Sequence, residues 1–467
     1  MRKWMIWTIW LVFTVGLSAW IGIGLLNTTI ETQSTASTNV SADNGFFLIG
    51  ETTSGHHQIE LACENCHTDP FGGEEILQEA CENCHLAELN AVRDAHPKRK
   101  FTDPSNADRI AVLDARYCVT CHREHKADIT QAMGLTVPED VCFLCHENIG
   151  EDRETHKDLA FDTCASSGCH NFHDNRALFE DFLVENADQP RISSHPLIAP
   201  LTAVEALYME GAIASAAESG RLTLGQADAP ANLMNSDVAE SWAGSVHAAA
   251  SVNCNGCHEQ NGIWQENVSL QQCADCHEDQ NSGFLLGKHG MRIDAGLPPM
   301  TPAMARIPMH ESAHQQELTC TSCHGAHDFD RQLAAIDACL GCHSSDHVNA
   351  YEGSAHARLS ELAFSGNAPE ESAVTCATCH MPRETRLVAG REVTHVQHNQ
   401  NANLRPSDKM LRGVCMNCHS LAFSMDALAD TTLVESNFTG LPQVHVESID
   451  MAVKRRQAII GRDRTYR

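Results

Sequence analysis

The chain has few of the side chains that normally fill a protein interior. Among its 467 residues, aromatic residues make up 5% and hydrophobic residues 42%. That is little apolar material for the two or three domains that this length allows. An ordinary hydrophobic core of this size is therefore not expected, unless a bound group fills part of the interior.

Basic residues are also scarce. The sequence has 32 Lys and Arg against 61 Asp and Glu, which gives a formal net charge of −29. Binding of nucleic acid requires a basic footprint, so nucleic acid is not expected as a partner. The acidic balance indicates a well-solvated exterior.

Long apolar runs are absent except for one at the start. Residues 4–26 carry no charge and follow Arg2-Lys3. This run is longer than the apolar part of a signal peptide, about 7–15 residues, and matches the ~20 residues of a membrane span. We expect residues 1–26 to anchor the protein in the inner membrane, with the rest of the chain on the periplasmic side. A cleaved signal, which would leave a soluble periplasmic protein, is the alternative.

Cysteine, by contrast, is abundant and fully accounted for. Cys-x-x-Cys-His is the attachment sequence of c-type haem, in which both thiols bind the porphyrin and the histidine binds the iron. Eleven such motifs use all 22 cysteines. The first five are Cys63–Cys66–His67, Cys81–Cys84–His85, Cys118–Cys121–His122, Cys142–Cys145–His146 and Cys164–Cys169–His170, the last with four residues between its cysteines. The other six are Cys254–Cys257–His258, Cys273–Cys276–His277, Cys320–Cys323–His324, Cys339–Cys342–His343, Cys376–Cys379–His380 and Cys415–Cys418–His419.

Disulfides and zinc sites are the alternatives, because they too consume cysteines in pairs. Neither requires a histidine directly after every second cysteine. The sequence therefore predicts eleven covalently attached haem c groups, which would replace much of the missing core. A chain without haem is expected not to fold, because here ligand binding and folding are coupled.

The spacing of the motifs divides the chain. We expect a flexible tether at 27–53, a pentahaem module at 54–175, a helical linker at 176–240, a hexahaem module at 241–450 and a frayed basic tail at 451–467. The linker helix would begin at a capping box, Thr202-x-x-Glu205, and end near Gly220. The fold class is mainly α with extensive coil and little or no sheet, packed around stacked haems.

Within the modules, motifs recur at short distances. Fourteen residues separate His258 from Cys273, and fourteen separate His324 from Cys339. This is an internal repeat whose unit is a pair of motifs. So short a connection places two porphyrins close together.

A second histidine is expected on each iron, because 17 of the 28 histidines lie outside the motifs. No methionine keeps a fixed spacing to a motif, so we expect bis-histidine sites of low potential. His125, His173 and His327 follow a motif histidine by three residues, so that one helical turn could aim each at a neighbouring haem. The further distal candidates are His57, His96, His156, His247, His289, His310, His314, His347, His356, His395 and His398, while His195 is left open between ligand and loop residue.

One segment matches a different metal site. His310-Glu311-Ser312-Ala313-His314 has the His-Glu-x-x-His pattern of zinc metalloproteases. One match of this kind is not surprising in a chain so rich in histidine. We expect both histidines to lie on one helical face and to bind haem iron.

Two resemblances follow from these motifs. Residues 54–175 resemble the class III multihaem cytochromes c, on the strength of the motifs, the His56-His57 pair and the wider Cys164–Cys169 spacing. Residues 240–450 resemble the hydroxylamine oxidoreductase and octahaem reductase superfamily, because Trp-Ala-Gly-Ser-Val-His at 242–247 and Tyr-Glu-Gly-Ser-Ala-His at 351–356 stand upstream of motifs.

We expect an electron-transfer protein of periplasmic respiration, with redox proteins such as a quinol-linked donor and a terminal reductase as partners. The second resemblance implies an enzyme acting on nitrogen or sulfur compounds at one open haem as the alternative. No motif here ends in Lys, as the catalytic motif of pentahaem nitrite reductases does, and Tyr466 is the only tyrosine after the last motif. An extracellular conductive cytochrome is a further alternative, against which the predicted anchor argues.

Overall fold

The computed structural model describes residues 10–16 and 49–465, except for 70, 132–133, 139, 154–155, 158–169, 175–179, 195–219, 235, 326, 331, 389–390 and 405–408. The chain divides into residues 1–48 and 49–467. In the first unit, residues 10–16 are helical. Across the described part of the chain, no helix is both long enough and apolar enough to span a membrane. Most of the predicted anchor, the helix predicted from Thr202, His195, Cys164 and Cys169 lie outside the described residues.

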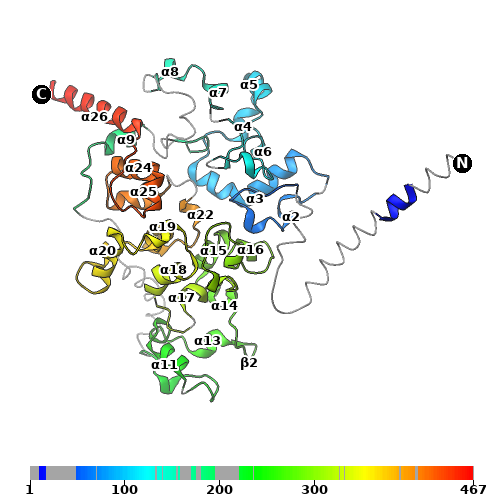
Figure 1. The fold of residues 1–467 in the computed structure, drawn as a ribbon, viewed down its shortest axis with the longest axis vertical. Helices are drawn as coiled ribbons and strands as arrows, with labels where there is room; N and C mark the ends of the chain where they lie inside the picture. Colours follow the sequence, from blue (N-terminus) through cyan, green and yellow to red (C-terminus); the bar gives the residue numbers. More distant parts are fainter. Residues whose placement is uncertain are drawn as a thin grey trace. The chain divides into compact units, whose positions relative to one another are not determined.

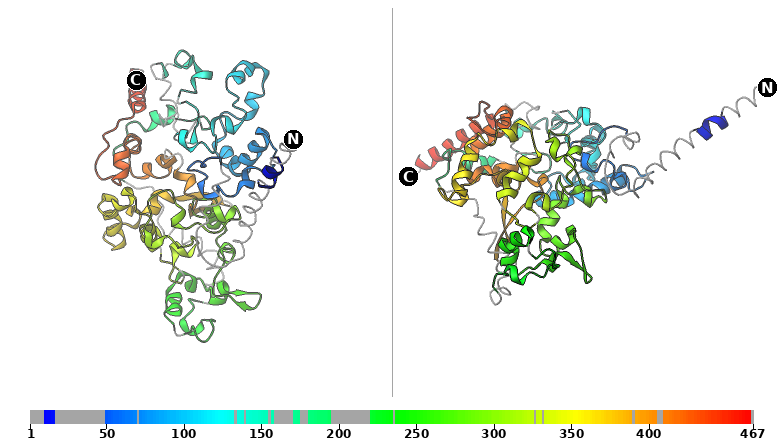
Figure 2. Two further views of the ribbon diagram at one scale, coloured as in Figure 1. Left: turned by 45° about the vertical axis from the view of Figure 1, so that its right-hand side comes forward. Right: turned by 60° about the horizontal axis from the view of Figure 1, so that its bottom comes forward.

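Short helices dominate the second unit, which confirms the predicted mainly α fold with little sheet (Figures 1 and 2). Those before residue 190 are α2 (Cys63–Cys66), α3 (Glu74–Val92), α4 (Lys98–Phe101), α5 (Ala107–Val112), α6 (Cys118–Cys121), α7 (Phe143–His146), α8 (Ile149–Asp152) and α9 (Glu180–Asn186). Those up to residue 350 are α11 (Asp237–Gly244), α12 (Val246–Ala249), α13 (Cys254–His258), α14 (Leu270–Ala274), α15 (Glu278–Leu286), α16 (Met291–Asp294), α17 (Thr321–His324), α18 (Ala338–Cys342) and α19 (Asp346–Asn349). The last are α20 (Ala355–Phe364), α21 (Cys376–His380), α22 (Asn401–Leu404), α23 (Lys409–Gly413), α24 (Leu421–Ala429), α25 (Thr431–Glu435) and α26 (Glu447–Thr465).

Strands form only two small antiparallel ribbons in the described residues. One pairs β1 (Glu259–Gln260) with β2 (Ile263–Trp264), and the other pairs β3 (Arg383–Val388) with β4 (Arg391–Val396). Both ribbons directly follow an attachment motif. They turn the chain back after the motif histidine and contribute no central sheet.

The attachment motifs that the structure describes in full are helical turns. The first cysteine opens a turn, and the amide of the following histidine donates to the carbonyl of that cysteine, as from His67 to Cys63 at 2.8 Å and from His122 to Cys118 at 2.9 Å. This places the two thiols and the imidazole on successive positions of one turn. The backbone therefore presents all three groups toward the same neighbourhood.

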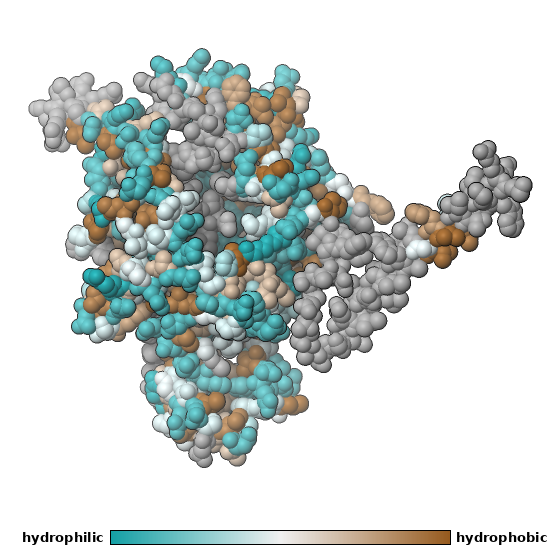
Figure 3. Space-filling model, viewed as in Figure 1, coloured by the Kyte–Doolittle hydropathy of each residue, from teal (hydrophilic) through white to brown (hydrophobic). Residues whose placement is uncertain are grey.

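Apolar packing is divided among small clusters instead of one core. The largest joins α9, α23, α24 and α26 through Leu183, Leu411, Met425 and Ile449. Two smaller clusters surround Trp242 and Tyr351. Figure 3 shows mainly hydrophilic described residues on the face in view, with apolar ones scattered between them. The limited apolar packing agrees with an interior that the polypeptide alone does not fill.

The basic C-terminal segment is a helix, so the expectation of a frayed tail is wrong. In α26, Ile449 and Ala452 are buried in the cluster with α9. Arg456 Nη1 donates to the carbonyls of Val184 and Glu185 at 3.1 Å each. Together these apolar contacts and hydrogen bonds fix the helix on α9.

Candidate haem sites

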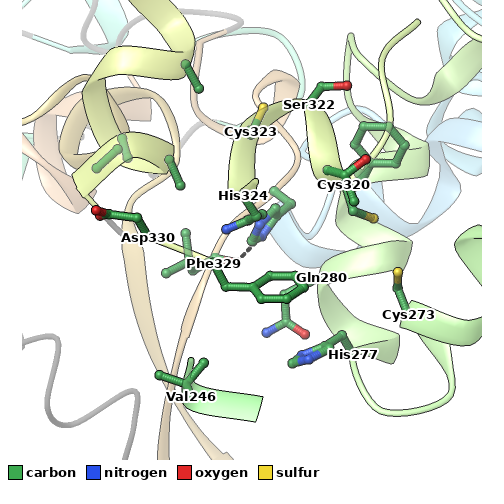
Figure 4. A pocket seen from close by; sticks show the side chains of 18 of the residues that line it. Val246, Cys273, His277, Gln280, Cys320, Ser322, Cys323, His324, Phe329 and Asp330 are labelled. Atoms are coloured by element: carbon green, nitrogen blue, oxygen red, sulfur yellow. Dashed lines mark hydrogen bonds between the residues drawn. The ribbon is translucent and has the colours of Figure 1, made fainter. Parts of the chain in front are cut away.

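A large cavity lies among four attachment motifs of the second half. Its volume is about 2800 Å³, several times that of an ordinary small-molecule site. The thiols of four consecutive motifs line it: Cys254, Cys257, Cys273, Cys276, Cys320, Cys323, Cys339 and Cys342. In Figure 4, Cys273 and Cys320 project from different segments into the same space, beside His277 and His324.

The cysteines do not form disulfides. Every cysteine that the structure describes is free. No group of three or more His, Cys, Asp or Glu side chains in the described residues could hold a metal ion by itself. Neither the disulfide nor the zinc alternative therefore gains support from the described part of the chain.

Histidine rings occur in facing pairs, and each pair joins one motif histidine with one histidine from elsewhere. The centroid separations in all ten pairs lie between 5.9 and 6.3 Å. The pairs, motif histidine first, are His85–His56, His146–His96, His122–His173, His170–His156, His277–His247, His258–His327, His343–His289, His324–His398, His380–His347 and His419–His356.

That separation is the one expected for two imidazoles on opposite sides of one iron. A histidine nitrogen binds such a metal at about 2 Å, so the two nitrogens stand about 4 Å apart, and the ring halves bring the centroids to about 6 Å. The residues present therefore fit a haem with two axial histidines at ten of the eleven motifs.

The protonation of the rings agrees with this role. Burial, and then neighbouring histidines, lower the pKa of His289, His324 and His380 to about 4. These rings are therefore neutral at pH 7, which is the form that coordinates metal.

Hydrogen bonds at Nδ1 orient many of the rings. His122 donates to the carbonyl of Gly134 at 3.0 Å, His258 to that of Gln265 at 2.7 Å, and His398 to that of Val396 at 2.9 Å. A donor bond at Nδ1 fixes the tautomer that leaves Nε2 free for the iron. The fold thus supplies both the ligand and its orientation.

Some predicted ligands are not brought into such a pair. His67 has no second ring at this separation among the described residues. His57, His125, His310, His314 and His395 are likewise outside the ten pairs. Nε2 of His395 lies 3.6 Å from Glu384 Oε2, which gives this ring a different partner.

The His-Glu-x-x-His segment has no helical face. Glu311–Ala313 is a single 3-10 turn, and His310 precedes it in an extended conformation. The His310 amide donates to the carbonyl of Cys342 at 2.8 Å, so the segment runs beside the motif that ends at His343. The expected i, i+4 arrangement of both rings on one α-helix is wrong.

The chain does not continue as the expected helical turn between a motif and the histidine three positions after it, at His125 and His327. Helix α6 ends at Cys121 and α17 at His324, before the second histidine is reached. His125 itself has φ +59°, and Gly325 has φ +63°. A left-handed turn, not a continued helix, therefore directs the chain here.

Sequence reasoning missed His56, and a local signal could have found it. Ser-x-His precedes four paired rings, at Ser54–His56, Ser245–His247, Ser345–His347 and Ser354–His356. In three of them the serine is the N-cap residue of a helix, and in two its side chain accepts a hydrogen bond: Ser245 from the amide of Ala248, and Ser354 from that of Ala357. The cap starts a short helix whose first turn carries the histidine.

The serine cap also helps to explain why the hexapeptides at 242–247 and 351–356 are similar. Trp242 and Tyr351 are buried, and their polar atoms donate to the carbonyls of Val252 at 3.1 Å and Val374 at 2.9 Å. Each aromatic side chain anchors the segment that places the capped histidine. The likeness between the hexapeptides therefore has a local structural cause.

The comparison with protein families agrees with these sites. Residues 55–147 and 246–344 each match the family model of cytochrome c3. Both parts of the chain are thus similar to a family of multihaem electron-transfer cytochromes. A search of the curated proteins and a search of the solved structures found no match. No comparison supports the resemblance to hydroxylamine oxidoreductase.

The two matched regions show that the repeat is larger than the predicted pair of motifs, since each holds four. Six residues separate His56 from Cys63, and six separate His247 from Cys254. In both regions the second motif pairs with this upstream histidine. The fourth motif in both pairs with a histidine that follows the second, as in His146–His96 and His343–His289. We call residues 55–147 the first repeat and residues 246–344 the second repeat.

Proposed function

We propose that the protein is an electron-transfer cytochrome with eleven covalent haems, each held between two histidines. The observation that carries the proposal is the set of ten imidazole pairs at 5.9–6.3 Å. A haem bound between two imidazoles supplies reversible one-electron exchange and has no free position for a substrate. The chain supplies the attachment thiols, the axial ligands and their orientation.

For the eleventh pair, the repeat supports His125 as the partner of His67. In the second repeat, His327 follows the third motif by three residues and faces His258 of the first motif. His125 has the same place in the first repeat, and its Nδ1 donates to the carbonyl of Gly50 at 2.8 Å, which leaves Nε2 free.

His57 is the alternative partner of His67. Its Nε2 is buried without a hydrogen-bond partner, and its Nδ1 lies 3.3 Å from the carbonyl of Ser54. Its counterpart in the second repeat, however, is Ala248, which cannot bind iron. A ligand set shared by both repeats therefore includes His125 and leaves His57 out.

Neighbouring cysteines support a continuous series of sites. The thiols of Cys81 and Cys118 lie close together, as do those of Cys273 and Cys320 and those of Cys339 and Cys376. Each of these contacts joins one motif to the next one along the chain. Haems attached to adjacent thiols would lie close enough for rapid electron exchange.

The proposal extends to the cellular setting. The uncharged run at 4–26 supports an exported protein, anchored by this segment on the periplasmic side of the inner membrane, or released there if the segment is cleaved. A quinol-linked donor and a terminal reductase or another cytochrome are the proposed partners in anaerobic respiration.

The test uses the exported, haem-loaded chain. Mass spectrometry and a pyridine haemochrome assay should give eleven haems per chain. Electron paramagnetic resonance of the oxidised protein should show only low-spin iron. A haem count well below eleven would refute the proposal.

The spectrum also tests the enzyme alternative. His67, which faces no second ring among the described residues, is the one observation in its favour. A high-spin signal of about one haem per chain that small anionic ligands convert to low spin would indicate an open site there.

A further inference from the structure

Two carboxylates set one haem site apart from the others. In the pair His56–His85, both rings face an acidic side chain: His56 Nδ1 lies 2.6 Å from Glu124 Oε1, and His85 Nδ1 lies 3.3 Å from Glu88 Oε2. In each of the other nine described pairs, at least one ring lacks a carboxylate. His122–His173, for example, combines the Gly134 carbonyl with Asp94.

Glu124 is held in place for this contact. The amide and the hydroxyl of Thr53 donate to its two oxygens at 2.8 and 2.9 Å. Its side chain is 31% exposed, so water screens it only in part. Glu88 lies one turn after His85 on α3 and reaches the ring along the helix surface.

A carboxylate at Nδ1 changes the ligand itself. It draws the Nδ1 proton toward itself, which makes the imidazole more basic and a stronger donor to the metal. A stronger, more anionic ligand favours the ferric form over the ferrous form and lowers the reduction potential. Here both axial ligands of a single iron receive this effect.

The second repeat provides an internal comparison, because its second motif, Cys273–His277, occupies the same place. Gln280 stands where Glu88 stands, three residues after the motif histidine, and Figure 4 shows it beside His277. In sequence, Ala326 takes the place of Glu124. Nδ1 of His247 is buried and has no partner. The second repeat thus has the corresponding pair of histidines but not the equivalents of Glu88 and Glu124.

The site formed by His56 and His85 also lies where the two repeats meet. Lys288 Nζ donates to the carbonyls of Ser54 and Gly55 at 2.8 and 2.7 Å, directly before His56. Arg292 Nη1 donates to the Gln58 carbonyl at 2.9 Å in a buried contact. Cations of the second repeat therefore hold the segment that carries the distal histidine.

On these grounds, and given the proposed bis-histidine haems, we propose that Glu124 and Glu88 are positioning residues. They make the Cys81–Cys84–His85 site the low-potential member of the series, at the junction of the repeats. An electron on this haem is transferred to haems of higher reduction potential in either repeat. Electrons therefore do not accumulate on the haem at the junction of the repeats.

The test is a spectroscopic redox titration of the exported, haem-loaded chain and its Glu124→Gln and Glu88→Gln variants. We expect the lowest-potential component to move upward in each. About a tenfold change in its ferric-to-ferrous ratio per carboxylate is expected, which equals about 59 mV for a one-electron couple. Glu79→Gln, on an exposed position of α3, removes the same charge without a ring contact and should leave the titration unchanged.

A reciprocal variant tests the same effect in case the first variants fail to assemble with haem. Gln280→Glu places a carboxylate near His277 and should lower one component of the titration. The inference is overturned if haem content and low-spin iron are intact while all these titrations match the wild type. Loss of low-spin iron in the wild-type protein would instead refute the bis-histidine proposal itself.

Discussion

His327 stands three residues after the motif histidine His324, yet its ring faces His258, with centroids 5.9 Å apart and ring planes within 10° of parallel. The segment after one attachment motif thereby places a histidine ring opposite the histidine of another motif. This relationship couples the first and third motifs of the second repeat, and it is the basis for assigning His125 to His67 in the first.

Replacement of His125 tests that assignment. His125→Ala should convert one haem of the eleven from low-spin to high-spin, because His67 would lose its axial partner. Electron paramagnetic resonance measures the change directly. His57→Ala is the matched control and should leave the spectrum low-spin. If the two variants behave the other way round, His57 is the ligand and the repeats differ at this site.

The serine caps before the distal histidines should stabilise the fold. Ser245 and Ser354 are both 3% exposed, and each accepts a backbone hydrogen bond from the first turn of its helix. Ser354→Ala should lower the free energy of unfolding by about 1 kcal/mol, the usual cost of losing such a cap. Thermal unfolding of the haem-loaded protein measures this. Ser365→Ala, at an exposed position after α20, should change stability little.

The docking of the C-terminal helix should depend on pH through His445. Its two ring nitrogens lie 3.2 Å from Asp426 of α24 and 3.3 Å from Asp450 of α26. The hydrogen bond with Asp426, and then that with Asp450, raises the pKa of His445 above its usual 6.5. The protonated ring is thus favoured in the folded state. Its stabilising effect is complete below pH 6.5 and is lost as the pH rises through the raised value.

Thermal unfolding at pH 5.5 and pH 8.5 measures this effect. The melting temperatures of wild type and His445→Gln should differ more at the lower pH. An equal difference at both values would show that the charge of the ring is irrelevant. Since the side chain is 51% exposed, the effect should weaken with added salt.

A chain that never receives haem should remain largely unfolded. Its apolar clusters are small, and the cavity among the four motifs of the second repeat would be left as a void of about 2800 Å³. Production without the attachment machinery should give a protease-sensitive chain with no cooperative transition by circular dichroism. A sharp unfolding transition in the haem-free chain would contradict this expectation.

The two kinds of axial ligand differ in how far the sequence predicts them. A motif such as Cys118–His122 is local, so one turn of backbone determines where its histidine lies. The partner of His122 is His173, whose position depends on the hydrogen bond from the Ala95 amide to its carbonyl at 2.7 Å and on the contact with Asp94. Such long-range contacts have no local signature, and for that reason the sequence provided candidates but not pairs.

The errors had local causes. His57 is predicted as a ligand and His56 is omitted, although Ser-x-His precedes His56 as it precedes three other paired rings. The His310–His314 segment matches a helical pattern, but the extended residues before it pair with the strand-like end of a motif, at Met309 and His343. Tertiary contacts there prevailed over the local pattern.

The contacts between cysteines of successive motifs, such as Cys81 with Cys118 and Cys339 with Cys376, have a consequence for how such a chain can change length. At three places in the described residues, sites that are neighbours in the sequence are thus also neighbours in space. A segment with four sites could therefore be duplicated, or a pair of sites added at one end, without changing the contacts between the existing sites. Duplication would add sites to this architecture, whereas loss of the C-terminal part would also remove His398, the partner of His324 in the second repeat.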